Sequence, residues 1–224
     1  MLRSSTAIAT VGGCIAALIA TANPVAAHPH VWVQSKSRVV YEKDTVTAIQ
    51  QTWVFDEFYS AMAVQGLDTN NDGQYSREEL DELAKINMEG LKEFAYFTAA
   101  KVGDAAIEFA PPSNAHLDYT GGILSLIFTL PLKSQAAIEG FAFATYDTTF
   151  FIAFELAKED GATLFGAPQT CEIALRDEPV SPGTNPALGN PSQNDTLTGA
   201  FSEQFGGASV ASATKWAVVE CKKS

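Results

Sequence analysis

Residues 45–55 read Thr-Val-Thr-Ala-Ile-Gln-Gln-Thr-Trp-Val-Phe, an alternating stretch in which Ile49, Trp53 and Phe55 fall on one face. Alternation with a period of two predicts a β-strand with one buried face. The preceding stretch, Val31 to Tyr41, alternates more loosely and is separated from the first by polar turn residues. The sequence therefore predicts that the fold begins with two neighbouring strands.

The next segment contains a twelve-residue loop, Asp68 to Glu79, with the sequence DTNNDGQYSREE. Calcium loops of the EF-hand type carry oxygen ligands at positions 1, 3, 5, 7, 9 and 12, and a glycine at position 6. Gly73 occupies the sixth position, where the chain must turn with a positive φ. The expected ligands are Asp68, Asn70, Asp72, Gln74, Ser76 and Glu79. We therefore expect one bound Ca²⁺, although Asp, Asn and Gly also favour turns that bind no metal.

Both flanks of this loop show helical spacing of apolar residues, most clearly at Phe55, Phe58, Tyr59 and Met62. Later stretches rich in Phe, Ile and Leu read as strands, and they cover residues 122–132, 140–146, 149–156, 167–175 and 215–221. The prediction is a single α+β domain, with a mainly antiparallel sheet and an EF-hand-like helix–loop–helix inserted at about residues 56–100. Residues 178–212 are rich in Pro, Gly, Ser and Asn, which indicates a flexible loop.

The first 27 residues have the pattern of a secretory signal peptide. Arg3 is followed by an apolar stretch from Ala7 to Ala20, and Val25-Ala26-Ala27 is a small-residue cleavage site. We expect export to the periplasm, with residues 28–224 as the folded domain. No second long apolar segment follows, so no membrane insertion is expected after cleavage.

The charge and the cysteines limit the partners and the chemistry. The formal net charge of −12 disfavours nucleic acid and anionic lipid as partners. Cys171 and Cys221 remain after cleavage, and an even pair in an exported chain predicts a disulfide bond. The sequence contains no Gly-x-Ser-x-Gly elbow and no phosphate-binding glycine loop, so we do not expect an enzyme.

Two of the three histidines lie at the expected new amino terminus, in His28-Pro29-His30. A terminal histidine offers an amine and an imidazole nitrogen, which together can chelate a transition metal. Further ligands are expected from His30, His116 and Asp147, with Asp118 as another carboxylate candidate. Imidazole suits zinc and nickel as well as copper. The alternatives are an ordinary chain end and, for Asp147, a simple hairpin turn.

Several of these motifs resemble those of a family of exported bacterial proteins of unknown function. Members are described as the periplasmic component of an uncharacterised ABC-type transport system, and they often lie beside, or are fused to, nickel/cobalt-type permeases. The resemblance implies a role in handling divalent metal, with a membrane permease as partner. It rests on residues 28–33, 53–57, 68–79, 146–151 and 218–221.

Three functions remain open at this point. The first is a calcium-binding periplasmic protein that also binds zinc, nickel or cobalt and works with a membrane metal permease. The second is a calcium-stabilised protein-interaction module without a transition metal. The third is a copper oxidoreductase with a histidine brace, which would need His30 or His116 as its second histidine.

Overall fold

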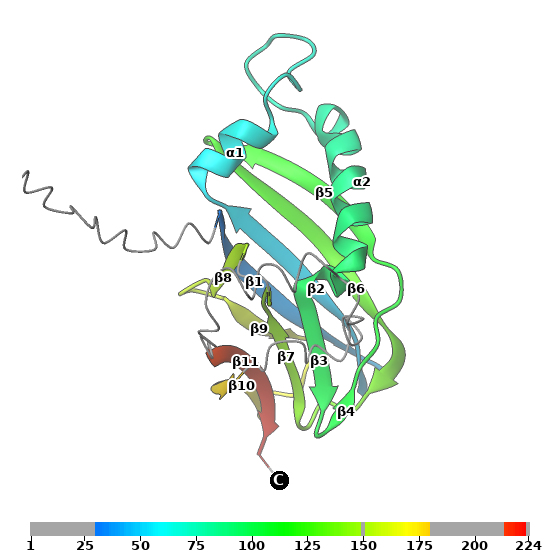
Figure 1. The fold of residues 1–224 in the computed structure, drawn as a ribbon. Coiled ribbons are helices and arrows are strands. Elements are labelled where there is room, and N and C mark those ends of the chain that lie inside the picture. Colours follow the sequence, from blue (N-terminus) through cyan, green and yellow to red (C-terminus); the bar gives the residue numbers. More distant parts are fainter. Residues whose placement is uncertain (1–29, 149–150, 180–212, 223–224) are drawn as a thin grey trace, which may run out of the picture.

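The computed structural model describes residues 30–148, 151–179 and 213–222 (Figure 1). Within these ranges the chain forms eleven β-strands and two α-helices. The helices are α1 (Glu57–Ala63) and α2 (Arg77–Glu93), and a 3₁₀ turn, η1 (Ala95–Phe97), follows α2. The strands are β1 (Val31–Glu42), β2 (Thr45–Phe55), β3 (Thr98–Val102), β4 (Ala105–Ala106), β5 (Ser113–Thr120), β6 (Ile123–Ala136), β7 (Phe141–Thr145), β8 (Ile152–Leu156), β9 (Ala162–Phe165), β10 (Cys171–Pro179) and β11 (Ala213–Cys221).

The strands form two sheets. The first has the order β5-β6-β2-β1-β8, and β9 also pairs with β1. The second has the order β10-β11-β7-β3-β4. β1 pairs in parallel with β8 and β9, whereas its pairing with β2 and all ladders of the second sheet are antiparallel.

The two strands predicted at the start of the fold are confirmed as the hairpin of β1 and β2. Lys43 and Asp44 form its turn with φ of 50° and 63°, which matches the positive φ values that two-residue hairpin turns require. Ile49, Trp53 and Phe55 are all buried on one face of β2. The fourth member of this face is a polar residue, Gln51, which is fully buried.

The side chain of Gln51 joins the two sheets through hydrogen bonds. Its Oε1 accepts a bond of 2.6 Å from the Ser37 hydroxyl of β1. Its Nε2 lies 3.2 Å from the Thr98 hydroxyl of β3 and 3.3 Å from the Thr145 hydroxyl of β7. Apolar residues surround this network, including Phe143 of β7 and Val39 of β1. The sheets are therefore held together by an apolar core that contains one satisfied amide.

The predicted α+β class with an inserted EF-hand-like helix–loop–helix is wrong, because the fold is mostly β and its two helices do not form such a unit. α1 has only seven residues and packs against β6, whereas α2 packs against β5. The helical spacing before the loop was misleading for a physical reason: Phe55 belongs to β2, and Phe58 and Met62 are 77% and 56% exposed. These residues do not form the buried stripe that a packed helix pair requires.

The predicted disulfide is confirmed between Cys171 and Cys221, which face each other at one end of the β10–β11 ladder. The predicted flexible loop begins at residue 178, but β10 continues to Pro179, and residues 180–212 lie outside the described ranges. The predicted signal peptide and His28 also lie outside them. None of the helices in the described ranges is long and apolar enough to cross a membrane.

Candidate metal centres

The Asp68–Glu79 loop follows α1, ends in the first turn of α2 and protrudes from the sheets (Figure 1). Its tight turn depends on two residues with positive φ, Asn71 at 58° and Gly73 at 79°. The Asp68 carboxylate accepts hydrogen bonds from the backbone N–H groups of Asp72 and Gly73, at 3.2 and 3.0 Å. The Asp68 carboxylate therefore faces the backbone of the loop.

The Glu79 side chain connects the first and last parts of the loop. One carboxylate oxygen accepts hydrogen bonds of 2.9 Å from both the backbone and the hydroxyl of Thr69. The other accepts bonds from the backbone and hydroxyl of Ser76, at 2.9 and 3.0 Å, and so completes the capping box of α2. These hydrogen bonds lower the pKa of Glu79 from 4.5 to about 2. The Ser76 backbone N–H makes the largest contribution, and the Thr69 hydroxyl makes the second largest. Glu79 is therefore ionised over the whole physiological range.

The donor set of this loop fits Ca²⁺, although the carboxylates do not converge on one point. Asp68, Asp72 and Glu79 supply carboxylate oxygens, Asn70 an amide oxygen and Ser76 a hydroxyl, all of which are hard ligands. Within the described ranges, no group of three His, Cys, Asp or Glu side chains is arranged to hold a metal ion. Calcium binding would therefore require Glu79 to exchange hydrogen bonds to Thr69 and Ser76 for the ion. Sequence inspection did not reveal the role of Thr69, because the calcium pattern leaves its position open.

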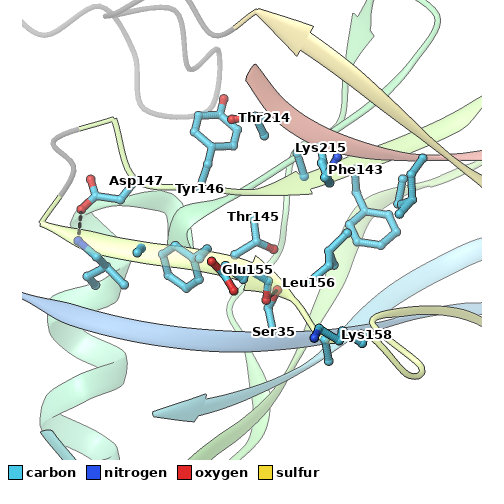
Figure 2. A pocket seen from close by; sticks show the side chains of 17 residues that line it. Ser35, Phe143, Thr145, Tyr146, Asp147, Glu155, Leu156, Lys158, Thr214 and Lys215 are labelled. Carbon is cyan, nitrogen blue, oxygen red and sulfur yellow. Dashed lines mark hydrogen bonds between the residues drawn. The ribbon is translucent and has the colours of Figure 1, made fainter. Parts of the chain in front are cut away.

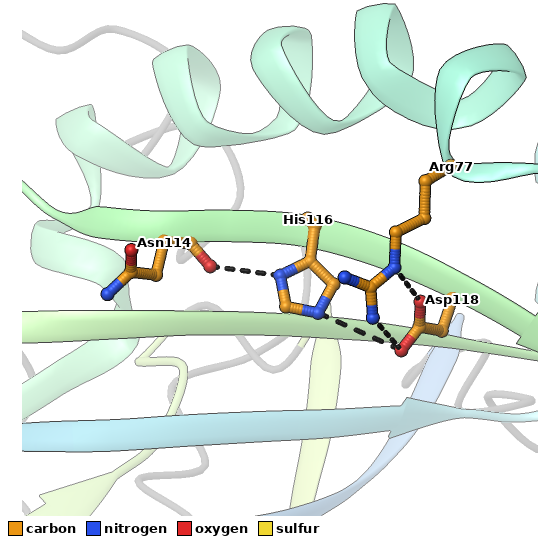
Figure 3. A network of polar contacts seen from close by, with 4 residues as sticks. All are labelled: Arg77, Asn114, His116 and Asp118. Carbon is orange, nitrogen blue, oxygen red and sulfur yellow. Dashed lines mark hydrogen bonds and ion pairs between the residues drawn. The ribbon is translucent and has the colours of Figure 1, made fainter.

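The histidine candidates fall in two separate places. His116 in β5 belongs to a polar network with Asn114, Arg77 and Asp118 (Figure 3). Its Nδ1 lies 3.0 Å from the Asn114 carbonyl oxygen, and its Nε2 lies 3.7 Å from an Asp118 oxygen. Arg77 donates two hydrogen bonds to the Asp118 carboxylate, at 2.8 and 3.1 Å. Asp118 is thus engaged by a guanidinium, a partner that its sequence context did not indicate.

The register of the first sheet separates His116 from His30. His116 pairs with Ile127, Ile127 pairs with Thr52, and Thr52 pairs with Lys36 of β1. Three strand spacings of about 4.8 Å lie between His116 and Lys36, and six residues of about 3.3 Å lie between Lys36 and His30. The structure therefore does not bring these two histidines to one site.

His30 and Asp147, in contrast, both contact the peptide unit between Phe151 and Ile152, at the start of β8. The His30 backbone N–H donates a hydrogen bond of 2.9 Å to the Phe151 carbonyl, and the two rings lie 5.0 Å apart. The Asp147 carboxylate accepts a hydrogen bond of 2.9 Å from the Ile152 backbone. Asp147 is buried and His30 is exposed. The fold thus brings these two residues to one corner of the molecule, where they contact this peptide unit from opposite sides, because its C=O and N–H groups point in opposite directions.

Comparison with known proteins supports a family assignment but no activity. An uncharacterised protein of Haemophilus influenzae is 23% identical over 154 residues, which are 67% of this chain and 73% of that protein. An uncharacterised 15.5 kDa protein of Spirochaeta aurantia is 32% identical over 85 residues, which are 38% of this chain and 61% of that protein. The model of a family of proteins of unknown function, DUF1007, matches residues 13–205. Because this match covers most of the sequence, the chain belongs to the DUF1007 family.

Proposed function

We propose that this protein is an exported calcium-binding protein whose Asp68–Glu79 loop holds one Ca²⁺. The observation that carries the proposal is the position of Glu79, whose carboxylate already contacts residues near both ends of a loop with only oxygen donors. In calcium loops the last acidic residue closes the site around the ion. Asp68, Asn70, Asp72 and Ser76 would supply further oxygens, and Gln74 its backbone carbonyl.

Calorimetric titration of Ca²⁺ into the mature protein, residues 28–224, tests this proposal. We expect one site per chain, with the affinity of extracellular calcium modules, roughly 10⁻⁴ to 10⁻³ M. Glu79→Gln removes one charged ligand and should weaken binding at least tenfold, whereas Glu78→Gln changes an exposed neighbour in the same helical turn and should leave it unchanged. Equal affinities in the two variants would refute the assignment of Glu79.

We further propose that the corner formed by His30 and Asp147 begins a site for zinc, nickel or cobalt, and that the protein works with a membrane metal permease. The contact of the His30 ring with Phe151 and of the Asp147 carboxylate with Ile152 supports the site. The resemblance to periplasmic proteins found beside nickel/cobalt-type permeases supports the partner. His28, as the expected terminal residue, would add an amine and an imidazole nitrogen.

Elemental analysis of protein secreted with His28 as its true terminus, and purified without chelator, tests the second site. We expect a stoichiometric transition metal that is lost in His30→Ala and retained in His116→Ala. The His116 variant is a matched control because its imidazole lies far from the proposed site. Calcium without any transition metal would instead support the calcium-stabilised interaction module.

A further inference from the structure

β8 presents an unpaired edge, which follows from the direction of its hydrogen bonds. At one end, the Val31 N–H donates to the Phe151 carbonyl, and at the other the Ala157 N–H donates to the Ser35 carbonyl. Backbone groups alternate in direction along a strand, so the odd-numbered residues of β8 face β1. The N–H and C=O groups of Phe154 and Leu156 therefore point away from β1. In the described ranges β8 pairs only with β1, so these groups have no strand partner there.

A cleft of about 590 Å³ runs along this edge (Figure 2). On its other side lie the end of β7 and the start of β11, which pair with each other only at Phe143–Ala217 and Ala142–Val218. Beyond Phe143 the two strands have no ladder pairs, which leaves the space that the cleft occupies. The cleft thus combines a free strand edge with an opening in the second sheet.

The lining of the cleft suits an extended peptide better than a compact polar ligand. Phe154 and Leu156 contribute apolar surface, Phe143 lies buried beneath the cleft, and Leu175 is half exposed at the border. β8 has five residues and is therefore about 17 Å long, which an extended segment of similar length would match. A peptide that adds to a sheet edge gains affinity from main-chain hydrogen bonds and specificity from pockets for alternate side chains.

The two ends of the cleft carry opposite charges. Asp147 lies at one end, Lys158 lies at the other end, beyond Leu156, and Glu155 lines the cleft between them (Figure 2). Lys215 also lines the cleft but is paired with Asp177 at 3.0 Å. Lys158 forms no ion pair among the described residues. A partner that reaches Lys158 should therefore carry a carboxylate.

We propose that the edge of β8 is a docking site for an extended peptide segment of a partner protein, which adds as a strand beside Phe154 and Leu156 and places an acidic side chain against Lys158. The cleft shares Asp147 with the proposed transition-metal site, but the contacts with the peptide need neither bound metal nor the histidine terminus. It gives the protein a surface for a protein partner that the metal sites alone do not supply.

Selection of phage-displayed random heptapeptides on the immobilised mature protein tests the proposal. We expect enriched peptides with alternating apolar residues and an acidic residue near one end. One enriched peptide is then synthesised for affinity measurements. Leu156→Pro removes a backbone N–H that points away from β1, so the peptide loses one hydrogen bond and should bind about tenfold more weakly. Lys158→Gln should weaken binding less and reduce its salt dependence, whereas Lys36→Gln on β1 serves as the unaffected control.

N-methylated peptides provide a test that does not depend on a protein variant folding. Methylation of the peptide nitrogens that face β8 should abolish binding to the native protein, and methylation of the alternate nitrogens should preserve it. Failure to enrich any peptide, or binding that is indifferent to both N-methyl patterns, overturns the proposal. Dimerisation of the protein that is lost in Leu156→Pro would also overturn it, because the edge would then pair with a second copy of this chain.

Discussion

The Glu79 carboxylate should make the metal-free protein sensitive to acid. Hydrogen bonds hold its pKa at about 2, below the ordinary 4.5, so the folded state binds this proton less tightly than the unfolded chain. Its contribution to stability is therefore complete above the ordinary pKa and is lost as the pH falls from there to about 2. We expect the unfolding free energy of the wild-type protein and of Glu79→Gln to converge in that window, with chelator present. A constant difference between the two at all pH values would contradict this assignment.

Gln51 is the buried polar residue whose replacement we expect to destabilise the core. Replacing it with alanine removes one hydrogen bond within the first sheet and two hydrogen bonds to the second sheet, and it leaves a cavity. We expect Gln51→Ala to lower the unfolding free energy by roughly 2–4 kcal/mol. Gln50→Ala changes the exposed neighbour in the same strand and should cost less than about 0.5 kcal/mol. Denaturant titration of both variants provides the measurement, and equal losses would show that the amide is not the cause.

Individual residues also show what sequence could and could not predict about the site. The calcium pattern is contiguous, so Asp68 to Glu79 could be found without knowing the fold, and the turn at Gly73 has the predicted positive φ. Whether the histidine candidates come together depends on the tertiary structure instead. Nothing in the local sequence indicates that His30, just before β1, lies next to residues 151–152, or that Arg77 engages Asp118. The distance between His30 and His116 is a property of strand register, which a single sequence does not reveal.

Within the loop and the helix that follows it, two glycines offer a matched comparison. A Cβ added at Gly73 or at Gly90 would meet no atom within 4 Å, so neither substitution creates a clash. Gly73 has a φ of 79°, whereas Gly90 lies inside α2. We expect Gly73→Ala to destabilise the protein by about 1–2 kcal/mol and to weaken calcium binding. Gly90→Ala should instead stabilise it by roughly 0.5–1 kcal/mol. Thermal unfolding of both variants distinguishes the two signs.

Among the elements, hairpins were more predictable than long-range pairs. The alternation in β2 and the turn before it predict the first hairpin, because each depends on neighbouring residues. The prediction of a packed helix pair was wrong. Phe58 and Met62 have the spacing of a buried helix face, but both are exposed. The parallel pairing of β8 and β9 with β1 could not be predicted, because neither strand carries a local signal for its partner.

For the whole molecule, the disulfide should determine how well the last hairpin is held. Cys171 and Cys221 are separated by 50 residues, and the chain-entropy model assigns about 4 kcal/mol to a loop of that size. We expect the double variant with Cys171→Ser and Cys221→Ser to lose roughly 2–4 kcal/mol of unfolding free energy. Treatment of the wild-type protein with a reductant should cause a similar loss and should not affect the variant further. Unchanged stability in both experiments would show that the hairpin holds without the bond.

The position of β1 has a consequence for how the molecule acquires its structure. β1 and its hairpin partner β2 are neighbours in the sequence, but the parallel partner of Val31 is Ile152, some 120 residues later. Contacts between residues so distant in sequence slow folding, because the intervening chain must be ordered first. β1, the first strand in the sequence, is thus among the last to be fully paired, and its open side can pair wrongly until β8 and β9 are in place. Nascent chains of this protein are therefore expected to depend on chaperones that shield strand edges.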